Sequence, residues 1–337
     1  MSKMTIREVA KLARVSQATV SRVLNGNATV DAALRDKVLS VIKQYDFHPN
    51  LAARNLKSGK TNTIGLLVAD LSDWYYGNFT KAVGESLREN NYSLFICNTD
   101  DDPAKEREYL QLLAEQRVDG IILNTTGGND EFICAISRSC PLALINRRVE
   151  GRDLVCDFID SGNQESAEMM ADHLIRHGHT RIGIINGSLA VSTARERLRG
   201  FANAMRRIGI AVDETYPYRY ENRYTAETGM RGAQHLLRQS PPPTALMTMN
   251  DSITVGALRH CKENAVAIPE ALSIVAYGGV GNAELFAVEP DYITFDPRVS
   301  GNKTVRCLLD RILHPDMVCK EVICSSVLIP RGSVRTI

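Results

Sequence analysis

Three short amphipathic stretches occupy the first 47 residues. Apolar residues recur at helical spacing over 6–13, 17–25 and 31–45, and Thr5 and Ser16 are suitable N-caps for the first two stretches. Asn25-Gly26-Asn27 favours a stop after the second stretch, because Gly and Asn tolerate the left-handed backbone conformation. The expected apolar stripe of the third helix is Leu34, Val38, Val41, Ile42 and Tyr45. Two short helices joined by a tight turn, with a third supporting them, predict an all-α helix-turn-helix headpiece.

From Thr61 the pattern changes to short apolar runs that alternate with amphipathic stretches. The candidate strands are 64–69, 93–97, 120–123, 142–145, 181–185, 245–248 and 272–276. The candidate helices lie near 75–90, 103–116, 162–177, 195–208, 225–239, 251–263 and 298–313. This alternation predicts an α/β core of parallel sheets covered on both faces, and the length suits two such lobes. A ligand site is then expected in the cleft where the carboxyl ends of the two sets of strands meet.

Composition narrows the class of protein. Of the 337 residues 44% are hydrophobic and 23% charged, which suits packed cores. No apolar run approaches the ~18 residues of a membrane span, and the N-terminus lacks the apolar segment of a signal peptide. Eight cysteines show no CxxC spacing, so they are expected to be reduced thiols of a cytoplasmic protein without a membrane partner.

The charge is unevenly distributed along the chain. Residues 1–60 hold eleven Lys or Arg against four acids, whereas the whole chain has a formal net charge of only +1. The outward face expected for the second helix carries Gln17, Ala18, Ser21 and Arg22, whose amide and guanidinium groups suit base edges in the major groove. A three-helix bundle that binds protein is the alternative. Charge and outward face together favour DNA.

The headpiece closely resembles that of the lactose-repressor/galactose-repressor family of bacterial transcription regulators. The resemblance rests on TIREVAKLARVSQATVSRVLNG and on VDAALRDKVLSVIKQYDFHPNLAARNLKSGKTNTIGLL. It implies that Gln17, Ala18 and Arg22 read bases. It also implies that Thr5, Ser16, Thr19, Ser21 and Asn25 hold phosphates.

The resemblance further implies a hinge helix within 48–60, beginning near Pro49. There Asn50, Ala53, Leu56 and Lys57 would contact DNA, with Leu56 wedged between base pairs in the minor groove at the centre of a palindromic operator. Taken by itself, Leu56 reads as an ordinary core leucine. Ser58-Gly59-Lys60-Thr61 resembles the end of a phosphate-binding loop, but Arg54 stands where that motif needs glycine.

The body carries the family's landmarks too, among them RVDGIIL, HLIRHGHTRIGIING, MNDSITVGAL and VLIPRGS. They imply a periplasmic-binding-protein-like core over 61–337, with an N-lobe of about 61–160 and 291–320 and a C-lobe of about 161–290 and 321–337. The lobes would be joined by crossings near 161, 290 and 321. The leucine-repeat tail of tetrameric members does not follow the last strand, so a homodimer is expected.

Family positions imply an effector pocket, and the implied residues are Tyr75, Tyr76, Asn146, Arg147, Asp160, Thr193, Arg197, Tyr224, Asn250 and Asp251. Asp160 and Asp251 could instead hold loops or the lobe interface. Gly278 stands where many relatives carry an aspartate that binds sugar hydroxyls. Arg147 replaces a purine-stacking tryptophan of one branch, so a purine is not expected. The expected effector is a sugar, sugar acid or sugar phosphate.

The charge of the effector depends on where two arginines point. If Arg147 and Arg148 join Arg197 in the cleft, the pocket is cationic and favours a sugar acid or phosphate, which is the preferred hypothesis. Alternatively Arg148 is exposed and Arg147 pairs with an acid such as Glu150 or Asp160, which leaves a neutral-sugar site.

Other chemistry finds little support in the sequence. His173, His177 and His179 lack the carboxylate or cysteine of a zinc motif, and the acidic run Asp100–Asp102 is explained by a loop or a helix N-terminus. We therefore predict no metal, cofactor or catalysis, and a ligand-responsive repressor of a carbohydrate or sugar-acid operon. The rival is an α/β enzyme or small-molecule binding module with an incidental basic head.

Overall fold

The computed structural model describes residues 4–24, 30–47, 60–281, 283 and 286–337. The chain divides into two compact units, Met1–Thr61 and Asn62–Ile337, and each is described by itself. No helix in the described ranges is both long and apolar enough to cross a membrane.

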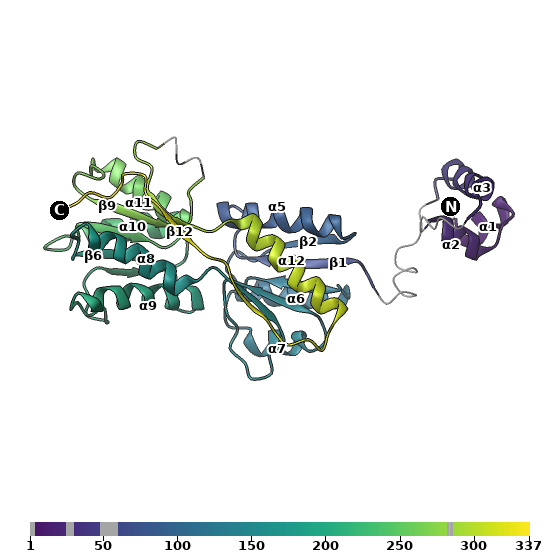
Figure 1. The fold of residues 1–337 in the computed structure, drawn as a ribbon, viewed down its shortest axis with the longest axis horizontal. Helices are drawn as coiled ribbons and strands as arrows, with labels where there is room; N and C mark the ends of the chain where they lie inside the picture. The colour runs from purple at the N-terminus through teal and green to yellow at the C-terminus, as the bar shows by residue number, and fades with distance from the viewer. Residues whose placement is uncertain (1–3, 25–29, 48–59, 282, 284–285) are drawn as a thin grey trace. The chain divides into compact units, whose positions relative to one another are not determined.

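The described part of the first unit contains three helices, α1 (Ile6–Ala13), α2 (Gln17–Leu24) and α3 (Ala32–Gln44) (Figure 1). Thr5 caps α1 and exchanges hydrogen bonds with Glu8 in a capping box, while the left-handed Arg14 ends the helix. Ser16 Oγ accepts the Thr19 N–H at 3.0 Å and so caps α2 as expected. Asp31 caps α3.

The headpiece core is small. Its buried residues are Val9, Ala10, Ala13, Val20, Val23, Val38 and Phe47. The stripe expected for α3 is partly wrong, because Leu34 and Tyr45 are exposed. Helix α3 has 13 residues, whereas the two helices it packs against have eight each. These shorter helices cover only part of its apolar stripe.

The second unit contains two sheets of six strands. The N-lobe sheet has the order β11-β5-β4-β3-β1-β2 and is parallel throughout. Its strands are β1 (Thr63–Val68), β2 (Ser93–Asn98), β3 (Gly120–Leu123), β4 (Leu142–Ile145), β5 (Asp157–Asp160) and β11 (Glu321–Ile323). Helices α5 (Trp74–Glu89) and α12 (Pro297–Leu313) cover one face, and α6 (Pro103–Glu115) and α7 (Asp130–Ser137) cover the other.

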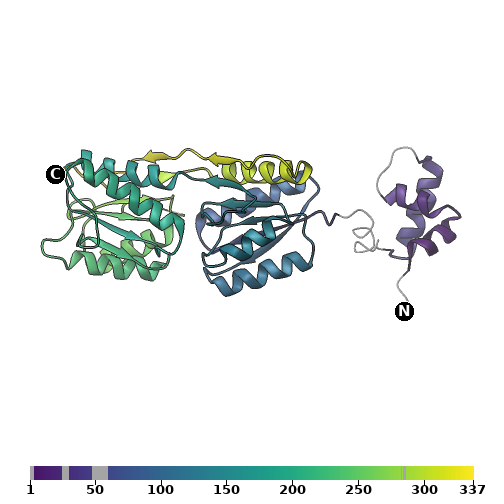
Figure 2. The same cartoon turned by 90° about the horizontal axis from the view of Figure 1, so that it is seen from below.

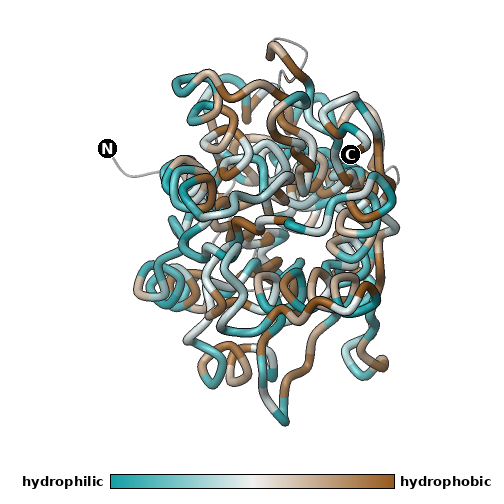
Figure 3. The backbone as a smooth tube through the Cα atoms, turned by 90° about the vertical axis from the view of Figure 1, so that its left-hand side faces the viewer, coloured by the Kyte–Doolittle hydropathy of each residue, from teal (hydrophilic) through white to brown (hydrophobic). Residues whose placement is uncertain are grey.

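The C-lobe repeats this design with the strand order β12-β10-β9-β8-β6-β7. Its strands are β6 (Ile182–Asn186), β7 (Arg219–Glu221), β8 (Ala245–Thr248), β9 (Ser273–Tyr277), β10 (Asp291–Thr294) and β12 (Val327–Ile329), of which β12 runs antiparallel to β10. Helices α8 (Asn163–Arg176) and α9 (Ser192–Arg207) pack on one face, and α10 (Ala226–Leu237) and α11 (Asp251–Glu263) on the other. Figure 3 shows hydrophobic and hydrophilic segments alternating along the chain, as strands buried between helices require.

The lobe boundaries differ from the expected ones in the last third of the chain. Strand β10 belongs to the C-lobe sheet and β11 to the N-lobe sheet, so the assignment of 291–320 to the N-lobe and 321–337 to the C-lobe is wrong at both ends. The chain crosses between the lobes at 161–162, at 295–296 and at 324–326. The last crossing is the yellow segment that runs along one side of both lobes in Figure 2. Short strands of three or four residues carry too little pattern to be assigned to a sheet from sequence.

Candidate functional site

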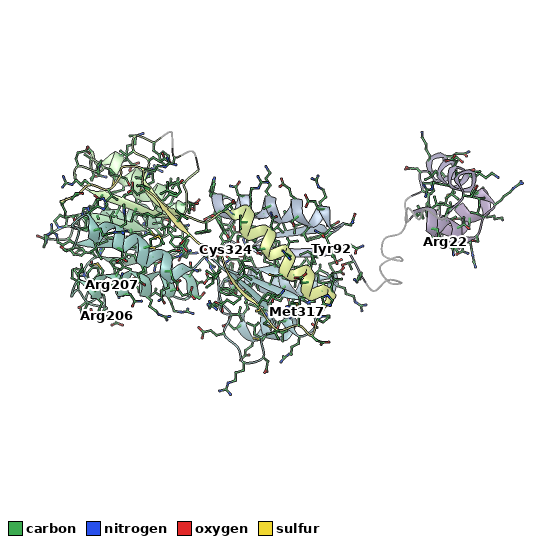
Figure 4. All side chains as sticks on the ribbon, in the orientation of Figure 1. Arg22, Tyr92, Arg206, Arg207, Met317 and Cys324 are labelled. Atoms are coloured by element: carbon green, nitrogen blue, oxygen red, sulfur yellow. The ribbon has the colours of Figure 1, made fainter. Side chains whose placement is uncertain are left out.

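The second helix of the headpiece presents a polar surface. Gln17, Ala18 and Arg22 are exposed on α2, opposite the buried Val20 and Val23. Arg22 is labelled in Figure 4, and the structure gives it no ion pair among the described residues. The short side chain at Ala18 leaves the helix backbone open to close approach.

Three of the residues expected at phosphates, Thr5, Ser16 and Thr19, lie at the N-terminal ends of α1 and α2. Thr5 and Ser16 are exposed N-cap residues, and the Ser16 hydroxyl also lies 2.9 Å from that of Thr19. Ser21 is half-buried on α2. Helix N-termini carry unsatisfied N–H groups and a partial positive charge, which suits anions. Five further expected DNA contacts lie outside the described residues, namely Asn25, Asn50, Ala53, Leu56 and Lys57.

The core contains a cavity of about 330 Å³ between its two lobes. The N-lobe contributes the loops after β1, β2 and β4 together with the first turn of α5, and the C-lobe contributes the start of α9 and the loops after β7, β8, β9 and β10. These are the carboxyl ends of the strands, as the parallel topology requires. Nine of the ten predicted effector residues line the cavity: Tyr75, Tyr76, Asn146, Arg147, Thr193, Arg197, Tyr224, Asn250 and Asp251.

Asp160 is the predicted residue that the structure places elsewhere. It ends β5 and is buried, and one of its carboxylate oxygens accepts the Asn163 amide at 2.9 Å. Asn163 Oδ1 in turn accepts from Arg197 Nε at 2.9 Å and from the Tyr277 hydroxyl at 3.1 Å. Asp160 therefore lies behind the cavity wall. It orients the Asn163 amide, and that amide in turn holds Arg197.

Arg197 is buried yet makes no ion pair among the described residues. Its guanidinium donates to Asn163 and to the Met249 carbonyl, and its Cζ lies 3.7 Å from the centroid of the Tyr277 ring. Neutral acceptors and an aromatic face hold the group in place without cancelling its charge. An unneutralised cation therefore faces the cavity.

Arg147 is held differently. Its two terminal nitrogens donate to the two carboxylate oxygens of Asp101, and Nη1 also donates to the Thr125 carbonyl at 3.0 Å. Burial by itself lowers the pKa of this guanidinium, but the Asp101 carboxylate more than reverses the effect and raises it. The side chain lies in the cavity wall as a neutralised pair. Its partner is neither Glu150 nor Asp160.

Arg148 does not line this cavity, so the expectation of two further cationic groups in it is wrong. The side chain is 40% exposed and pairs with Glu196 at 3.2 Å and with Glu321 at 2.6 Å, beside Asp160 at 3.6 Å. It lines a second, smaller hollow of about 190 Å³ between the lobes. Its backbone N–H donates to Ser192 Oγ at 2.8 Å and thereby ties the N-lobe to α9.

Acidic side chains outnumber basic ones around the main cavity. Asp70, Asp73, Asp100, Asp101 and Asp251 face Arg147, Arg197 and Arg223. Asp73 caps α5 and lies beside Asp251 of the other lobe, which accepts the Trp74 N–H at 2.9 Å. Burial and then the Asp251 charge raise the pKa of Asp73 well above its ordinary range.

Aromatic rings supply the apolar part of the wall. Tyr75, Tyr76, Tyr224, Tyr277 and Phe295 all line the cavity. Burial raises the pKa of Tyr76 to about 12, so its hydroxyl stays neutral and can donate a hydrogen bond. The Thr193 hydroxyl is buried and finds no partner in the described structure.

Gly278 explains the departure noted in the sequence. Its φ is +91°, in the region that side-chain-bearing residues rarely adopt, and its N–H donates to the Ile293 carbonyl at 2.8 Å. An aspartate would be strained on this backbone. The acceptors of the cavity come instead from the N-lobe aspartates and Asp251.

Sequence reasoning missed several wall residues, chiefly Asp70, Asp73, Asp101, Tyr277 and Arg223. Asp102 does cap α6, as expected of the acidic run, but Asp100 and Asp101 before it turn toward the cavity. The position of 98–101 just after a candidate parallel strand was the available signal, since such loops lie at the ligand end of the sheet.

The three histidines have structural partners. His173 Nε2 lies 2.8 Å from Asp291 Oδ2, and His179 bridges the Thr244 hydroxyl and the Arg335 carbonyl. His177 Nδ1 lies 2.8 Å from the His173 carbonyl oxygen. Within the described ranges, no three His, Cys, Asp or Glu side chains are placed to hold a metal ion.

Comparison with known proteins assigns both units. Residues 5–50 match bacterial regulatory proteins of the lacI family, and residues 61–306 match the periplasmic binding proteins and sugar-binding domain of the LacI family. The chain belongs to the lacI family. This lacI-family protein is therefore a DNA-binding transcription regulator with a ligand-binding core.

Full-length relatives agree with this assignment. The chain is 32% identical to the HTH-type transcriptional repressor PurR of Haemophilus influenzae strain PittEE, over 338 residues and 99% of each chain. It is 31% identical to a ribose operon repressor of Haemophilus influenzae strain ATCC 51907, over 333 residues and again 99% of each chain.

Solved structures share the fold. The lac repressor dimer bound to operator and the anti-inducer ONPF has a TM-score of 0.85 at 23% identity and covers 99% of this chain and 100% of its own. A complex of the transcriptional regulator CelR with cellobiose has a TM-score of 0.74 at 25% identity, over 98% and 100%.

Proposed function

We propose that this chain is a repressor that binds palindromic operator DNA as a homodimer, and that a neutral, sugar-sized polyhydroxylated molecule in the inter-lobe cavity changes its DNA affinity. The target is proposed to be a carbohydrate or sugar-acid utilisation operon. No catalytic step is assigned to the chain, and a protein that acts on the chromosome of a bacterium works in the cytoplasm.

The make-up of the cavity wall carries the effector proposal. Five aspartates offer acceptors, whereas Arg197, the Thr193 hydroxyl and the tyrosine hydroxyls offer donors. Aromatic rings can stack on the apolar faces of a sugar ring. A ligand covered with hydroxyl groups, each both donor and acceptor, fits such a mixed surface.

An anionic effector loses most of its earlier support. Arg147 is already paired with Asp101, and Arg148 lies outside the cavity, so Arg197 is left beside several carboxylates. A carboxylate or phosphate ligand would be repelled by Asp70 and Asp251, which line the cavity and have no ion pair among the described residues. Arg147, which stands where one branch of the family has a purine-stacking tryptophan, is engaged in this ion pair with Asp101. The structure therefore adds no support for a purine ligand.

An exposed apolar edge supports dimerisation. Strand β2 is an edge strand of the N-lobe sheet, and Phe95 and Ile96 on it are 50% and 46% exposed. Unpaired edges with apolar side chains favour association with another chain. A two-fold dimer would match the two-fold symmetry of a palindromic operator.

The names of the relatives do not choose an effector. PurR and the ribose operon repressor match this chain almost equally, at 32% and 31% identity over 99% of its length. One solved complex whose ligand is a sugar, CelR with cellobiose, is 25% identical to this chain. The chemistry of the wall is therefore the better guide.

Calorimetry tests the effector class. We expect a neutral sugar to bind more tightly than its acid or phosphate form, and Arg197→Met to weaken that binding by about 1.5–3 kcal/mol through loss of charged hydrogen bonds. Arg199→Ala, at an exposed position of the same helix, is the matched control and should bind normally. Tighter binding of the phosphate or acid form would refute the neutral effector.

A gel shift separates the regulator from the rival enzyme or binding module. Operator-length palindromic DNA should shift at lower protein concentration than a scrambled duplex, and the effector should move the midpoint only if it binds the two states of the core unequally. Equal retention of both duplexes would refute sequence-specific binding. Analytical ultracentrifugation should show a dimer that Phe95→Lys weakens.

A further inference from the structure

Two cysteines flank neighbouring strands of the N-lobe sheet. Strands β5 and β11 pair in parallel register, with Phe158 opposite Glu321. The ladder continues one step before β11, because the Phe158 N–H donates to the Lys320 carbonyl at 2.8 Å. Two positions before the Phe158–Glu321 pair, the same register places Cys156 opposite Cys319.

The two thiols project from the same face of this edge. Phe158 and Glu321 share a face, because the Arg148 guanidinium lies 4.1 Å from the Phe158 ring centroid and 2.6 Å from Glu321. Side chains two positions apart in a strand point the same way, so Cys156 and Cys319 lie on that face too. Paired strands are about 4.8 Å apart, within the ~4.4–6.8 Å between Cα atoms that a disulfide spans.

A buried ion pair fixes the backbone on both sides of the cysteines. Asp157, next to Cys156, holds Arg311 through two bonds of 2.9 and 2.8 Å and also accepts the Lys320 N–H at 2.8 Å. Arg311 donates to the Met317 carbonyl at 3.3 Å, just before Cys319. Met317 is labelled in Figure 4 at the end of the segment that follows α12. The clamp keeps the two residues in register.

Their surroundings give the thiols different reactivity. Cys319 is exposed to solvent, whereas Cys156 is 8% exposed and packs in an apolar cluster with Phe158. Burial raises the pKa of Cys156 to about 12. Since the thiolate is the nucleophile, an oxidant in solution reaches and oxidises Cys319 first, and Cys156 then resolves the product.

We propose that Cys156 and Cys319 form a reversible disulfide when the protein meets a peroxide. The Cys319 thiolate attacks one peroxide oxygen, the O–O bond breaks, and hydroxide leaves and takes up a proton as water. The Cys156 sulfur then attacks the sulfenic sulfur, the S–O bond breaks, and a second water leaves with the Cys156 proton. Two thiols and one hydrogen peroxide give one disulfide and two waters.

The cross-link would fasten the shortest strand of the sheet. Strand β11 has three residues, lies at the edge, and leads directly into the 324–326 crossing toward the C-lobe. A covalent bond at its start would restrain β11 against β5, which leads into the crossing at 161–162. Oxidation is therefore expected to stiffen two of the three crossings between the lobes.

Peptide mapping tests the bond. The full-length protein is treated with hydrogen peroxide, alkylated and digested without reductant, and the linked peptides are identified by mass spectrometry. We expect a peptide pair joining Cys156 to Cys319 that dithiothreitol releases. Slower hydrogen exchange at 321–323 in the oxidised protein is the second readout.

Matched variants separate this bond from other thiol chemistry. Cys319→Ser, at a surface position, should abolish the linked pair, whereas Cys134→Ser, in the same apolar cluster as Cys156, should keep it. The proposal is wrong if Cys134 is the partner of Cys156, or if Cys319 links two copies of the chain. It is also wrong if Cys319 proceeds to sulfinic acid while Cys156 stays alkylatable.

Discussion

The headpiece and the core use their side chains in opposite ways. In the headpiece the candidate DNA contacts Gln17, Ala18 and Arg22 are exposed and lie within six residues of one helix. In the core the nine candidate effector contacts that line the cavity are buried or half-buried, and they come from five loops or helix starts between residues 75 and 251. The polar groups of α2 are hydrated before they meet a ligand, whereas many polar groups of the cavity are already removed from water by the fold.

This difference sets what each region needs from its fold. A recognition helix needs a small apolar face to hold it, and the seven buried headpiece residues supply that face. A buried polar cavity needs hydrogen-bond partners or a neutral form for every charge: Asp101 pairs with Arg147, the Asn163 amide accepts from Arg197, and the raised pKa of Asp73 favours its neutral form. Substitutions on the exposed face of α2 should therefore change DNA affinity, whereas substitutions of buried polar groups in the core should change the free energy of unfolding.

The largest effect is expected at the buried ion pair of the core. Asp157 and Arg311 are 0% and 2% exposed, so Asp157→Ala leaves an unpaired buried charge and should cost about 3–5 kcal/mol of unfolding free energy. Trp74 is the only tryptophan in the sequence, so its fluorescence during urea unfolding reports on the core alone. Hydrogen exchange in α1–α3 should not change. If the unfolding free energy of the variant fell by less than about 1 kcal/mol, the pair would contribute no more to stability than a surface ion pair.

The headpiece counterpart is Arg22→Ala. Loss of a base contact should weaken binding to the cognate operator by roughly 1–3 kcal/mol, with little change on scrambled DNA and none in the Trp74 unfolding curve. Fluorescence anisotropy at fixed salt measures both duplexes. Lys43→Ala, an exposed charge on α3, is the control for a general loss of positive charge. An equal loss on both duplexes would show a phosphate contact instead.

A smaller effect, here an increase in stability, is expected from Asp73→Asn. The folded pKa of Asp73 lies above its ordinary value near 3.8, because the side chain is buried and faces Asp251. The folded state therefore keeps a proton that the unfolded chain has lost, and stability falls as pH rises from about 3.8 to the folded pKa. Asn removes this loss, so the variant should be more stable at pH 7 by on the order of 1 kcal/mol and equal to the parent near pH 4.

Urea unfolding followed by Trp74 at several pH values measures this gain. Asp251→Asn removes the same repulsion, so the double variant should gain less than the sum of the single variants. A pH-independent difference, or strict additivity, would show that the two carboxyl groups do not interact.

The smallest effect concerns the cap of α3. Asp31 accepts the Ala33 and Leu34 N–H groups at 3.0 and 3.3 Å, so Asp31→Ala should destabilise the headpiece by about 1 kcal/mol. Asp36→Ala, at an exposed position inside the same helix, is the control. Hydrogen exchange of the α3 amides should accelerate only in the first variant, while the core transition stays in place. Equal acceleration in both variants would show that the Asp31 cap does not stabilise α3.

Local pattern was sufficient for the long helices and for the strands that are mostly apolar. The predicted strands 120–123, 142–145 and 245–248 and the helix 251–263 have the observed bounds, and Ser16 caps α2 as the hydroxyl before a helical stretch predicts. Strands β5, β7, β10, β11 and β12 and the eight-residue α7 were not predicted. They are short, and they lack the nearly continuous apolar run of the equally short β3, β4 and β8; the DFID of β5, for example, has two charged residues in four.

The sequence by itself determined the three headpiece helices, the two-lobed parallel architecture and nine of the residues that line the cavity, since the 3.6-residue period, the strand–helix alternation and the family motifs can all be read along the chain. Only the tertiary structure decided which charges meet. Asp101 reaches Arg147 across 46 positions, Arg148 joins Glu196 and Glu321 instead of the cavity, and Asp160 works through Asn163. A long guanidinium can reach partners on several loops, and its choice depends on three-dimensional distance and on the cost of burying an unpaired charge.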